Sequence, residues 1–391
     1  MKFSTYVEAA ILAGLIIASQ GAAAQTCEIK VGAVGPMSGA AAAFGLSTKY
    51  GTEFAAAMVN RDGGLQVGGQ KCMVKVVSFD SLCTVAGGAA ASNYMASEGV
   101  SVVLGPVCSP ETTGFRPVAQ RQKQTSFSGS YMLGVISPEF PLSFHALLAP
   151  VTFGPILVKE AVNQFKFKSI IIIGPNDQGG TDGSRQLAKL YTEAGVTTSE
   201  EYFQRGTANF GPLATRIMAA NPEAVEIATV PPADAIGVVR ELMAAGFKGA
   251  IGSLGGVPFS AVAQGAGGVE NLKAYYWLET APVDHPGVVK LKQDFEKVMN
   301  TPPVDNPNMI VFALAAEVTL RAITEAGTAT DAEKVAEAMR KLTPESRYMG
   351  KAGWRGKTVY GINQELSFPI GLGMVIDGKK QPVRTIQVPA E

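Results

Sequence analysis

Short, continuous apolar runs alternate with longer stretches of helical periodicity along most of the chain. Continuous apolar runs are typical of strands that are buried on both faces, so this alternation predicts a parallel sheet covered by helices. In the first half the pattern predicts strands over 29–34, 73–79, 101–104, 124–128 and 143–148, with intervening helices that include 47–59 and 86–98.

The alternation begins again with the most apolar run of the chain, residues 168–173. Further strands are predicted over 198–203 and 224–230 and near residues 250 and 275, with helices over 183–194, 212–220, 234–245, 288–299, 308–326 and 331–341. A hairpin-like segment is predicted over 366–380. The sequence therefore predicts two doubly wound α/β units, with a ligand in the cleft between the carboxyl ends of their strands.

The segment 104–113 joins a predicted strand to a predicted helix. Ser109 is the expected N-cap, Pro110 takes the first helical position, and Glu111 suits the positive end of the helix dipole. Free backbone N–H groups at such a start, together with the Ser109 hydroxyl, would bind a ligand carboxylate. The alternative is an ordinary strand-to-helix turn without a ligand.

The N-terminus carries the features of a secretory signal peptide. Lys2 precedes an apolar run over 9–18, and alanines at 22–24 supply the small residues that a signal peptidase requires. This predicts a signal peptide over 1–24 and a mature protein that begins at Gln25. No later segment is long and apolar enough to cross a bilayer, so the mature chain is expected to be soluble and exported.

Four cysteines fit an oxidising compartment: Cys27, Cys72, Cys83 and Cys108. Three pairings are possible from the sequence alone. Cys27 and Cys72 open the first and second predicted strands, and Cys83 and Cys108 follow the carboxyl ends of the second and third. This placement favours the pairs Cys27–Cys72 and Cys83–Cys108.

Composition and motifs argue against several classes of function. Lys plus Arg equal Asp plus Glu at 33 each, which gives no basic face for nucleic acid or an anionic membrane. The chain has no dinucleotide fingerprint, P-loop or nucleophile elbow. Its two histidines, His145 and His285, are isolated and are interpreted as structural, so no metal, cofactor or catalytic residue is predicted. A secreted hydrolase remains an alternative because many loops carry acidic residues.

Four segments together resemble the exported leucine/isoleucine/valine-binding proteins that serve bacterial ABC importers: residues 29–39, 60–65, 79–83 and 105–109. The resemblance implies a type I periplasmic binding fold, with two lobes joined by three crossovers near residues 149, 281 and 357. One lobe would comprise 25–149 with 281–357, and the other 150–280 with 358–391. It also implies a periplasmic protein that presents its closed lobes to the membrane permease subunits, and a disulfide between Cys83 and Cys108. We expect the protein to be a monomer.

The resemblance also places the ligand residues. The serine that holds the ligand carboxylate corresponds to Ser109, the aromatic residue of the first loop to Phe44, and a backbone contact to Ser130. Two aromatic residues of the second lobe fall near Gly179 and Pro231. Gln178, Asn176 and Asp177 lie near enough to replace them if the alignment slips by a residue or two.

Two positions depart from the pattern of the amino-acid binders. The hydroxyl that helps to hold the ligand ammonium is replaced by Met132, and the acidic residue that pairs with it by Leu254. A buried ammonium without an acceptor is heavily penalised, so we predict a carboxylate ligand without an α-amine, such as an aromatic or branched aliphatic acid. Its pocket would also include Tyr131. The alternative is that Asp177 or Asp234 supplies the missing charge and that the ligand is an amino acid.

Overall fold

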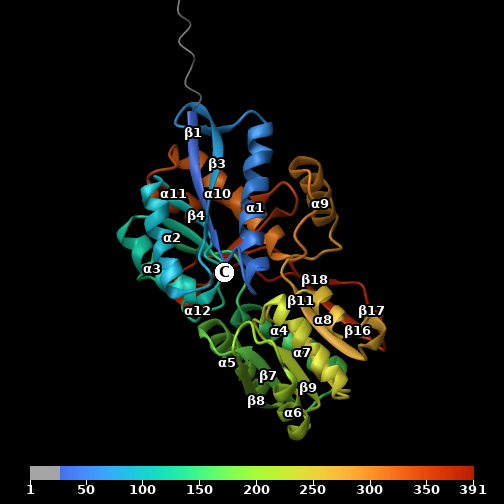
Figure 1. Ribbon diagram of the computed structural model, residues 1–391. Helices are drawn as coiled ribbons and strands as arrows, with labels where there is room; N and C mark the ends of the chain where they lie inside the picture. Colours follow the sequence, from blue (N-terminus) through green and yellow to red (C-terminus); the bar gives the residue numbers. More distant parts are fainter. Residues whose placement is uncertain (1–26) are drawn as a thin grey trace, which may run out of the picture.

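A computed structural model describes residues 27–391, so the predicted signal peptide lies outside the described residues. The chain forms two lobes, one above the other in Figure 1, and each lobe contains a sheet with helices on both faces. None of the helices between residues 27 and 391 combines the length and the apolar character that a bilayer crossing requires.

The first sheet has the strand order β14-β15-β6-β5-β4-β1-β3-β2 and is parallel except at its two edges, where β2 and β14 run antiparallel to their neighbours. Its strands are β1 Cys27–Gly35, β2 Leu65–Val67, β3 Gln70–Asp80, β4 Val102–Leu104, β5 Thr125–Ser128, β6 Ser143–His145, β14 Gly353–Arg355 and β15 Glu365–Ser367. The helices of this part are α1 Ala42–Arg61, α2 Val85–Ser97, α3 Ser109–Arg121, α9 Pro286–Met299, α10 Asn308–Ala326, α11 Ala332–Lys341 and α12 Lys357–Tyr360. A small hairpin of β12 Glu345–Ser346 and β13 Gly350–Lys351 follows α11.

The second sheet has the order β17-β16-β11-β10-β9-β7-β8, with β18 paired to β16. Its strands are β7 Ser169–Pro175, β8 Thr197–Phe203, β9 Ala224–Ile227, β10 Ala250–Ser253, β11 Ala274–Glu279, β16 Ile370–Ile376, β17 Lys379–Lys380 and β18 Arg384–Ile386. Its helices are α4 Pro150–Phe165, α5 Gln178–Glu193, α6 Gly211–Ala220, α7 Pro232–Ala244 and α8 Phe259–Gly265, with a short 3₁₀ turn over Val269–Asn271.

The apolar strands form the sheets because their side chains are covered on both faces. In β7, for example, every residue from Ile170 to Ile173 is at most 4% exposed. Helix α10 is buried almost all round and packs along α1, which explains its nearly uninterrupted apolar sequence. The predicted fold class, two doubly wound α/β lobes, is confirmed.

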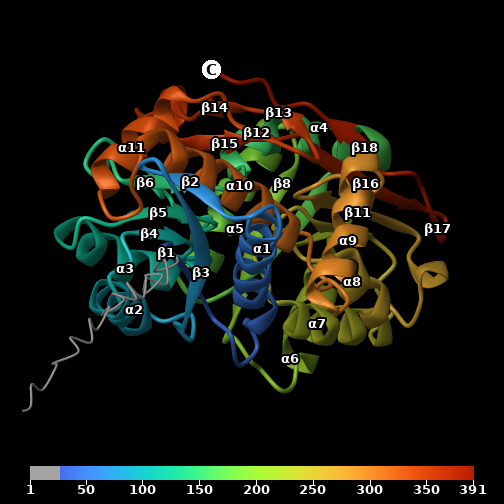
Figure 2. The same ribbon diagram turned by 90° about the horizontal axis from the view of Figure 1, so that it is seen from above.

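The chain passes between the two sheets three times: between β6 and β7, between β11 and β14, and between β15 and β16. The C-terminal strands accordingly run along one side of the molecule from one lobe to the other (Figure 2). β15 pairs with β6 in the first sheet, although a division at residue 357 would assign it to the second lobe. The edge strand β14 was not predicted, and β15 falls at the start of the predicted hairpin-like segment 366–380.

A buried hydrogen bond between His145 and Glu365 fastens two of these passages together. Nδ1 of His145 lies 2.9 Å from Oε1 of Glu365, and neither side chain is exposed. The same carboxylate accepts hydrogen bonds from the N–H of Ala149 at 3.2 Å and from the hydroxyl of Thr152 at 2.8 Å. His145 therefore has the structural role that its strand position predicted.

Both predicted disulfides are present, Cys27–Cys72 and Cys83–Cys108. Cys27 and Cys72 are direct partners in the register of β1 and β3. Cys83 follows β3, and Cys108 directly precedes α3. The sheet itself therefore brings Cys27 and Cys72 together, whereas Cys83 and Cys108 follow β3 and β4, which β1 separates, and meet beside the starts of the adjacent helices α2 and α3.

Replacing either cysteine pair by serine is expected to lower the free energy of unfolding by about 2–4 kcal/mol, because the unfolded chain regains the entropy of an open loop. Urea titration of each variant measures the loss, and the reduced wild-type protein provides the control. Free thiols in the unfolded but unreduced mature protein would contradict the pairing.

Candidate functional site

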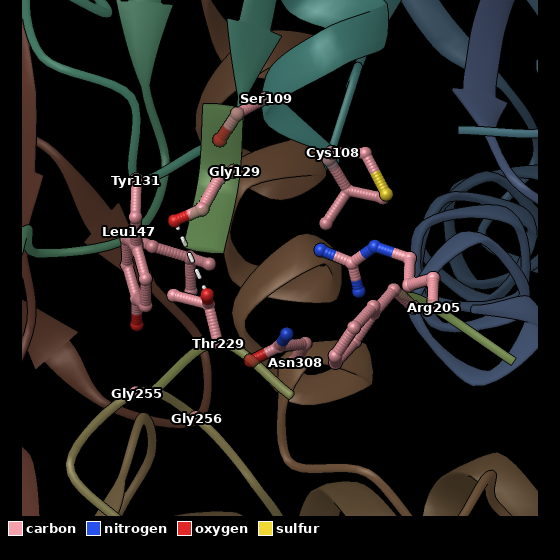
Figure 3. A pocket seen from close by; sticks show the side chains of 13 residues that line it. Cys108, Ser109, Gly129, Tyr131, Leu147, Arg205, Thr229, Gly255, Gly256 and Asn308 are labelled. Atoms are coloured by element: carbon pink, nitrogen blue, oxygen red, sulfur yellow. Dashed lines mark hydrogen bonds between the residues drawn. The ribbon is translucent and has the colours of Figure 1, made fainter. Parts of the chain in front are cut away.

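The carboxyl ends of the strands in both sheets face a single pocket between the lobes (Figure 3). The cavity itself is about 50 Å³, within a space of about 450 Å³ that includes its open mouth. Nearly all of its residues follow the carboxyl end of a strand, and Phe44 and Asn308 come from the starts of α1 and α10. The lining residues are Phe44, Val107, Cys108, Ser109, Gly129, Tyr131, Leu147, Gly179, Arg205, Thr229, Gly255, Gly256 and Asn308.

The start of α3 differs from the prediction. The helix begins at Ser109 with Cys108 as its N-cap, one residue earlier than expected. The side chain of Glu111 turns back and accepts hydrogen bonds from the N–H groups of Val107 at 2.5 Å and Cys108 at 2.6 Å. These two backbone donors are therefore occupied by the protein itself, and the Ser109 side chain lines the pocket at the start of α3.

Ser130 lies directly behind Ser109. Its hydroxyl donates to the Ser109 oxygen at 3.0 Å and accepts from the N–H of Met132 at 3.2 Å. Because Ser130 uses its proton for this bond, the proton of Ser109 is free to point into the pocket. Ser130 thus orients Ser109 and is not itself among the lining residues.

Arg205 is the only charged residue among the lining residues, and the sequence reasoning missed it. It follows β8, and its guanidinium is fixed by Asp177, with Nε 2.5 Å from Oδ2 and Nη2 3.1 Å from Oδ1. The third nitrogen, Nη1, is buried and has no hydrogen-bond partner. A buried guanidinium N–H without an acceptor is costly, so this atom marks where an anion would be bound.

Asp177 is held ionised by this pairing. Burial opposes its charge, but the hydrogen bonds and positive charge of Arg205, with the N–H groups of Gly180 and Gly179, hold the pKa of Asp177 below its ordinary value. Asp177 also caps α5 through the Gly180 N–H at 3.0 Å. Its negative charge is therefore directed at Arg205 and the helix start and does not line the pocket.

Of the remaining predicted ligand positions, Phe44, Tyr131 and Gly179 line the pocket, and Met132, Leu254, Pro231 and Gln178 do not. Met132 packs in a small apolar cluster with Val135 and Ile136. Leu254 is fully buried in the core, and Pro231 is the N-cap of α7. The apolar side chains of Met132, Leu254 and Pro231 are therefore not part of the pocket lining.

Gln178 belongs to a row of side chains that joins the lobes. It lies on α5 with Asp182 and Gln186, at a spacing of four residues that puts all three on one helix face. Gln178 bonds to Thr113 at 2.5 Å, Asp182 accepts from the N–H of Leu133 at 3.1 Å, and Gln186 donates to the carbonyl of Tyr131 at 3.0 Å. This face of α5 therefore holds the second lobe against the first.

Like Asp177, the second alternative acid, Asp234, does not line the pocket. Asp234 accepts from the N–H of Gly206 at 3.1 Å and is not a lining residue. Glu226, the buried acid of β9, accepts from Tyr191 at 2.8 Å and from the N–H of Leu254 at 2.5 Å, behind the loop that forms the pocket wall. Within residues 27–391 no cluster of His, Cys, Asp and Glu has the arrangement of a metal site.

Comparison with known sequences decides the family. Residues 28–365 match the sequence profile of the family described as periplasmic binding protein. The chain belongs to the periplasmic binding protein family. Among its relatives is a leucine-, isoleucine-, valine-, threonine- and alanine-binding protein of Pseudomonas aeruginosa, 26% identical over 353 residues, which cover 88% of this chain and 90% of the relative.

Solved structures show the same periplasmic binding protein fold. A leucine-binding protein from Thermotoga maritima superimposes with a TM-score of 0.76 at 19% identity, covering 92% of this chain and 99% of the other. A solute-binding protein of an ABC transporter from R. palustris, in complex with benzoate, has a TM-score of 0.76 at 15% identity, covering 93% and 98%. At these identities the likeness concerns the fold alone.

The carboxyl of Glu111 in this periplasmic binding protein is expected to make stability depend on pH. Burial raises the pKa of Glu111 and outweighs the N–H groups of Cys108 and Val107, which lower it, so that the pKa is about 8. Because the folded state binds this proton more tightly than the unfolded state, where the pKa is near 4.5, the contribution of Glu111 to stability declines as pH rises from about 4.5 to about 8.

Glu111→Gln keeps the shape of the side chain and an oxygen for the two N–H groups but does not titrate. We expect its melting temperature, relative to wild type, to be higher at pH 8 than at pH 5. Thermal unfolding at the two values measures this difference. Burial also raises the pKa of Glu226 to about 8, so some pH dependence should remain in the variant. An equal effect of Glu111→Gln at both pH values would contradict the assignment.

Proposed function

We propose that the protein is the solute-binding component of an ABC importer and captures a small carboxylate without an α-amine in the pocket between its lobes. The observation that carries this proposal is Nη1 of Arg205, a buried guanidinium nitrogen without a partner at the pocket wall. The hydroxyl of Ser109, which Ser130 leaves free to donate, would share the carboxylate. Phe44 and Leu147 supply apolar surface for the rest of the ligand.

The charge of the lining supports an acid over an amino acid. Its one charged group is a cation, and no Asp or Glu is among its residues. An α-ammonium buried there would lack an ionic partner and would face the guanidinium, a penalty of several kcal/mol. A ligand with a carboxylate alone meets no such penalty.

The alternative is a branched-chain or other amino acid, as the name of the Pseudomonas aeruginosa relative indicates for that protein. It would require an acid to turn toward the ligand ammonium. Asp177 is the nearest candidate by sequence, but it would have to leave two hydrogen bonds with Arg205. The benzoate complex of the R. palustris protein supports the compatibility of this fold with amine-free acids.

A secreted hydrolase is the remoter alternative. Glycoside hydrolysis requires a pair of carboxyl groups beside the substrate, and no carboxyl group is among the pocket's lining residues. We therefore propose a binding protein without enzymatic activity. We further propose that the signal peptide directs export to the periplasm, where the protein is a monomer and its partners are the membrane permease subunits. The absence of net charge gives no reason to expect nucleic acid as a partner.

A thermal-shift screen of the mature protein tests the ligand class. Matched pairs isolate the amine: leucine against 4-methylpentanoate, and phenylalanine against 3-phenylpropanoate, with benzoate added. A ligand at about a hundred times its dissociation constant adds roughly 2.7 kcal/mol of stability and raises the melting temperature by several degrees. We expect shifts with the acids only. Shifts with the amino acids and none with the acids would overturn the proposal.

Arg205→Gln is expected to weaken the binding of the acid identified by the screen by about 1.5–3 kcal/mol, because a charge-assisted hydrogen bond is lost. Arg216→Gln is the matched control, since this half-exposed arginine pairs with Glu201 on the surface of the same lobe. Ser109→Ala should weaken the same ligand by about 1–3 kcal/mol. Isothermal titration measures all three variants, and unchanged affinity in Arg205→Gln would remove Arg205 from the site.

A further inference from the structure

A second buried polar atom without a partner lines the same pocket. Tyr131 is 7% exposed, and its hydroxyl oxygen has no hydrogen-bond partner. In Figure 3 its ring lies on the side of the pocket opposite the guanidinium of Arg205, beside Leu147. The pocket thus has Nη1 of Arg205 on one side and the phenol hydroxyl of Tyr131 on the other, and neither atom has a hydrogen-bond partner.

The position of this phenol is fixed by its surroundings. The ring of Tyr131 packs edge-on against Phe153 with centroids 6.3 Å apart, and Gln186 donates to its backbone carbonyl at 3.0 Å. Beyond the hydroxyl lies the pocket wall at Gly256, where an added Cβ would stand 3.7 Å from the oxygen. A rigid aromatic ring that ends in an unpaired hydroxyl is suited to bind one polar atom of a ligand.

We propose that the ligand carries a neutral oxygen, a hydroxyl or carbonyl group, at the end opposite its carboxylate, and that Tyr131 binds it. This inference rests on the proposed function, in which Arg205 and Ser109 bind the carboxylate. A buried polar group left unpaired is costly, so a site with an unpaired hydroxyl favours a ligand that satisfies it over one that does not.

The second group must be neutral because nothing near Tyr131 would balance a second negative charge. Arg205 is the only cation among the lining residues and is assigned to the first carboxylate. Burial, and then the negative charge of Glu365, raise the pKa of Tyr131, so the phenol stays protonated and its neighbourhood disfavours anions. The ligand class is therefore a monocarboxylic hydroxy or oxo acid and not a dicarboxylate.

The test combines two ligands with two proteins. Titration calorimetry measures the dissociation constants of benzoate and 4-hydroxybenzoate for wild type and for Tyr131→Phe. We expect the wild type to bind the hydroxylated acid roughly five- to tenfold more tightly, the value of one neutral hydrogen bond. Tyr131→Phe should abolish this preference without weakening benzoate. 2-Hydroxybenzoate, whose hydroxyl lies next to the carboxylate, should gain nothing from Tyr131.

The melting temperature of the ligand-free protein distinguishes a ligand-binding role of the Tyr131 hydroxyl from a structural one. Because the hydroxyl has no partner, Tyr131→Phe should not lower the melting temperature of the empty protein. Tyr348→Phe is the control: its hydroxyl bonds to Asp294 at 3.1 Å away from the pocket, and its loss should leave both dissociation constants unchanged.

The outcomes separate this inference from the proposal on which it rests. Equal affinity of wild type for benzoate and 4-hydroxybenzoate would overturn the role of Tyr131 and leave the amine-free carboxylate in place. A preference that persists in Tyr131→Phe would do the same, since another group would then read the hydroxyl. Binding of leucine with no binding of either acid would overturn both.

Discussion

The partly buried guanidinium of Arg205, whose side chain is 19% exposed, is the group around which the interlobe site is organised. A charged group is retained in such a place only when its hydrogen bonds are made, and Asp177 satisfies two of its three nitrogens. The third, Nη1, is the atom that a ligand would satisfy. A pocket with this one charge and no carboxylate among its lining residues has the opposite polarity to a site for an ammonium group.

The fold supplies this arrangement because both sheets direct the carboxyl ends of their strands at the same space. Arg205 follows β8, Ser109 follows β4, and Tyr131 follows β5, so residues from both lobes meet at one pocket. The contacts of the α5 face hold the lobes together around it.

Most of the fold was predictable from the sequence because the strands are buried on both faces and short helices separate them. The positions of the four cysteines at strand starts and ends, together with the resemblance for Cys83–Cys108, also made their pairing predictable. The edge strand β14 was not predicted, and the place of β15 beside β6 was missed because a pairing between segments more than 200 residues apart leaves no local pattern. The first helix begins at Ala42, five residues before the predicted start at residue 47. The prediction missed this first turn because its alanines and glycine show little amphipathic pattern.

The site was predictable only in part. Ser109, Phe44 and Tyr131 follow from the strand-to-loop positions and from the resemblance, and all three line the pocket. Arg205 was missed because a lone arginine after a strand reads as a surface residue unless its partner is known. The signal available was its place after β8, at the carboxyl edge of the sheet. The return of Glu111 to the N–H groups of Val107 and Cys108 is a local hydrogen-bond choice that spacing alone does not reveal.

A crystal structure of the mature protein with its bound acid tests the central claim most directly. We expect a carboxylate oxygen within hydrogen-bond distance of Nη1 of Arg205 and of the Ser109 hydroxyl, with the Arg205–Asp177 pair intact. A bound amino acid with its ammonium on Asp177, and Arg205 turned out of the pocket, would contradict it.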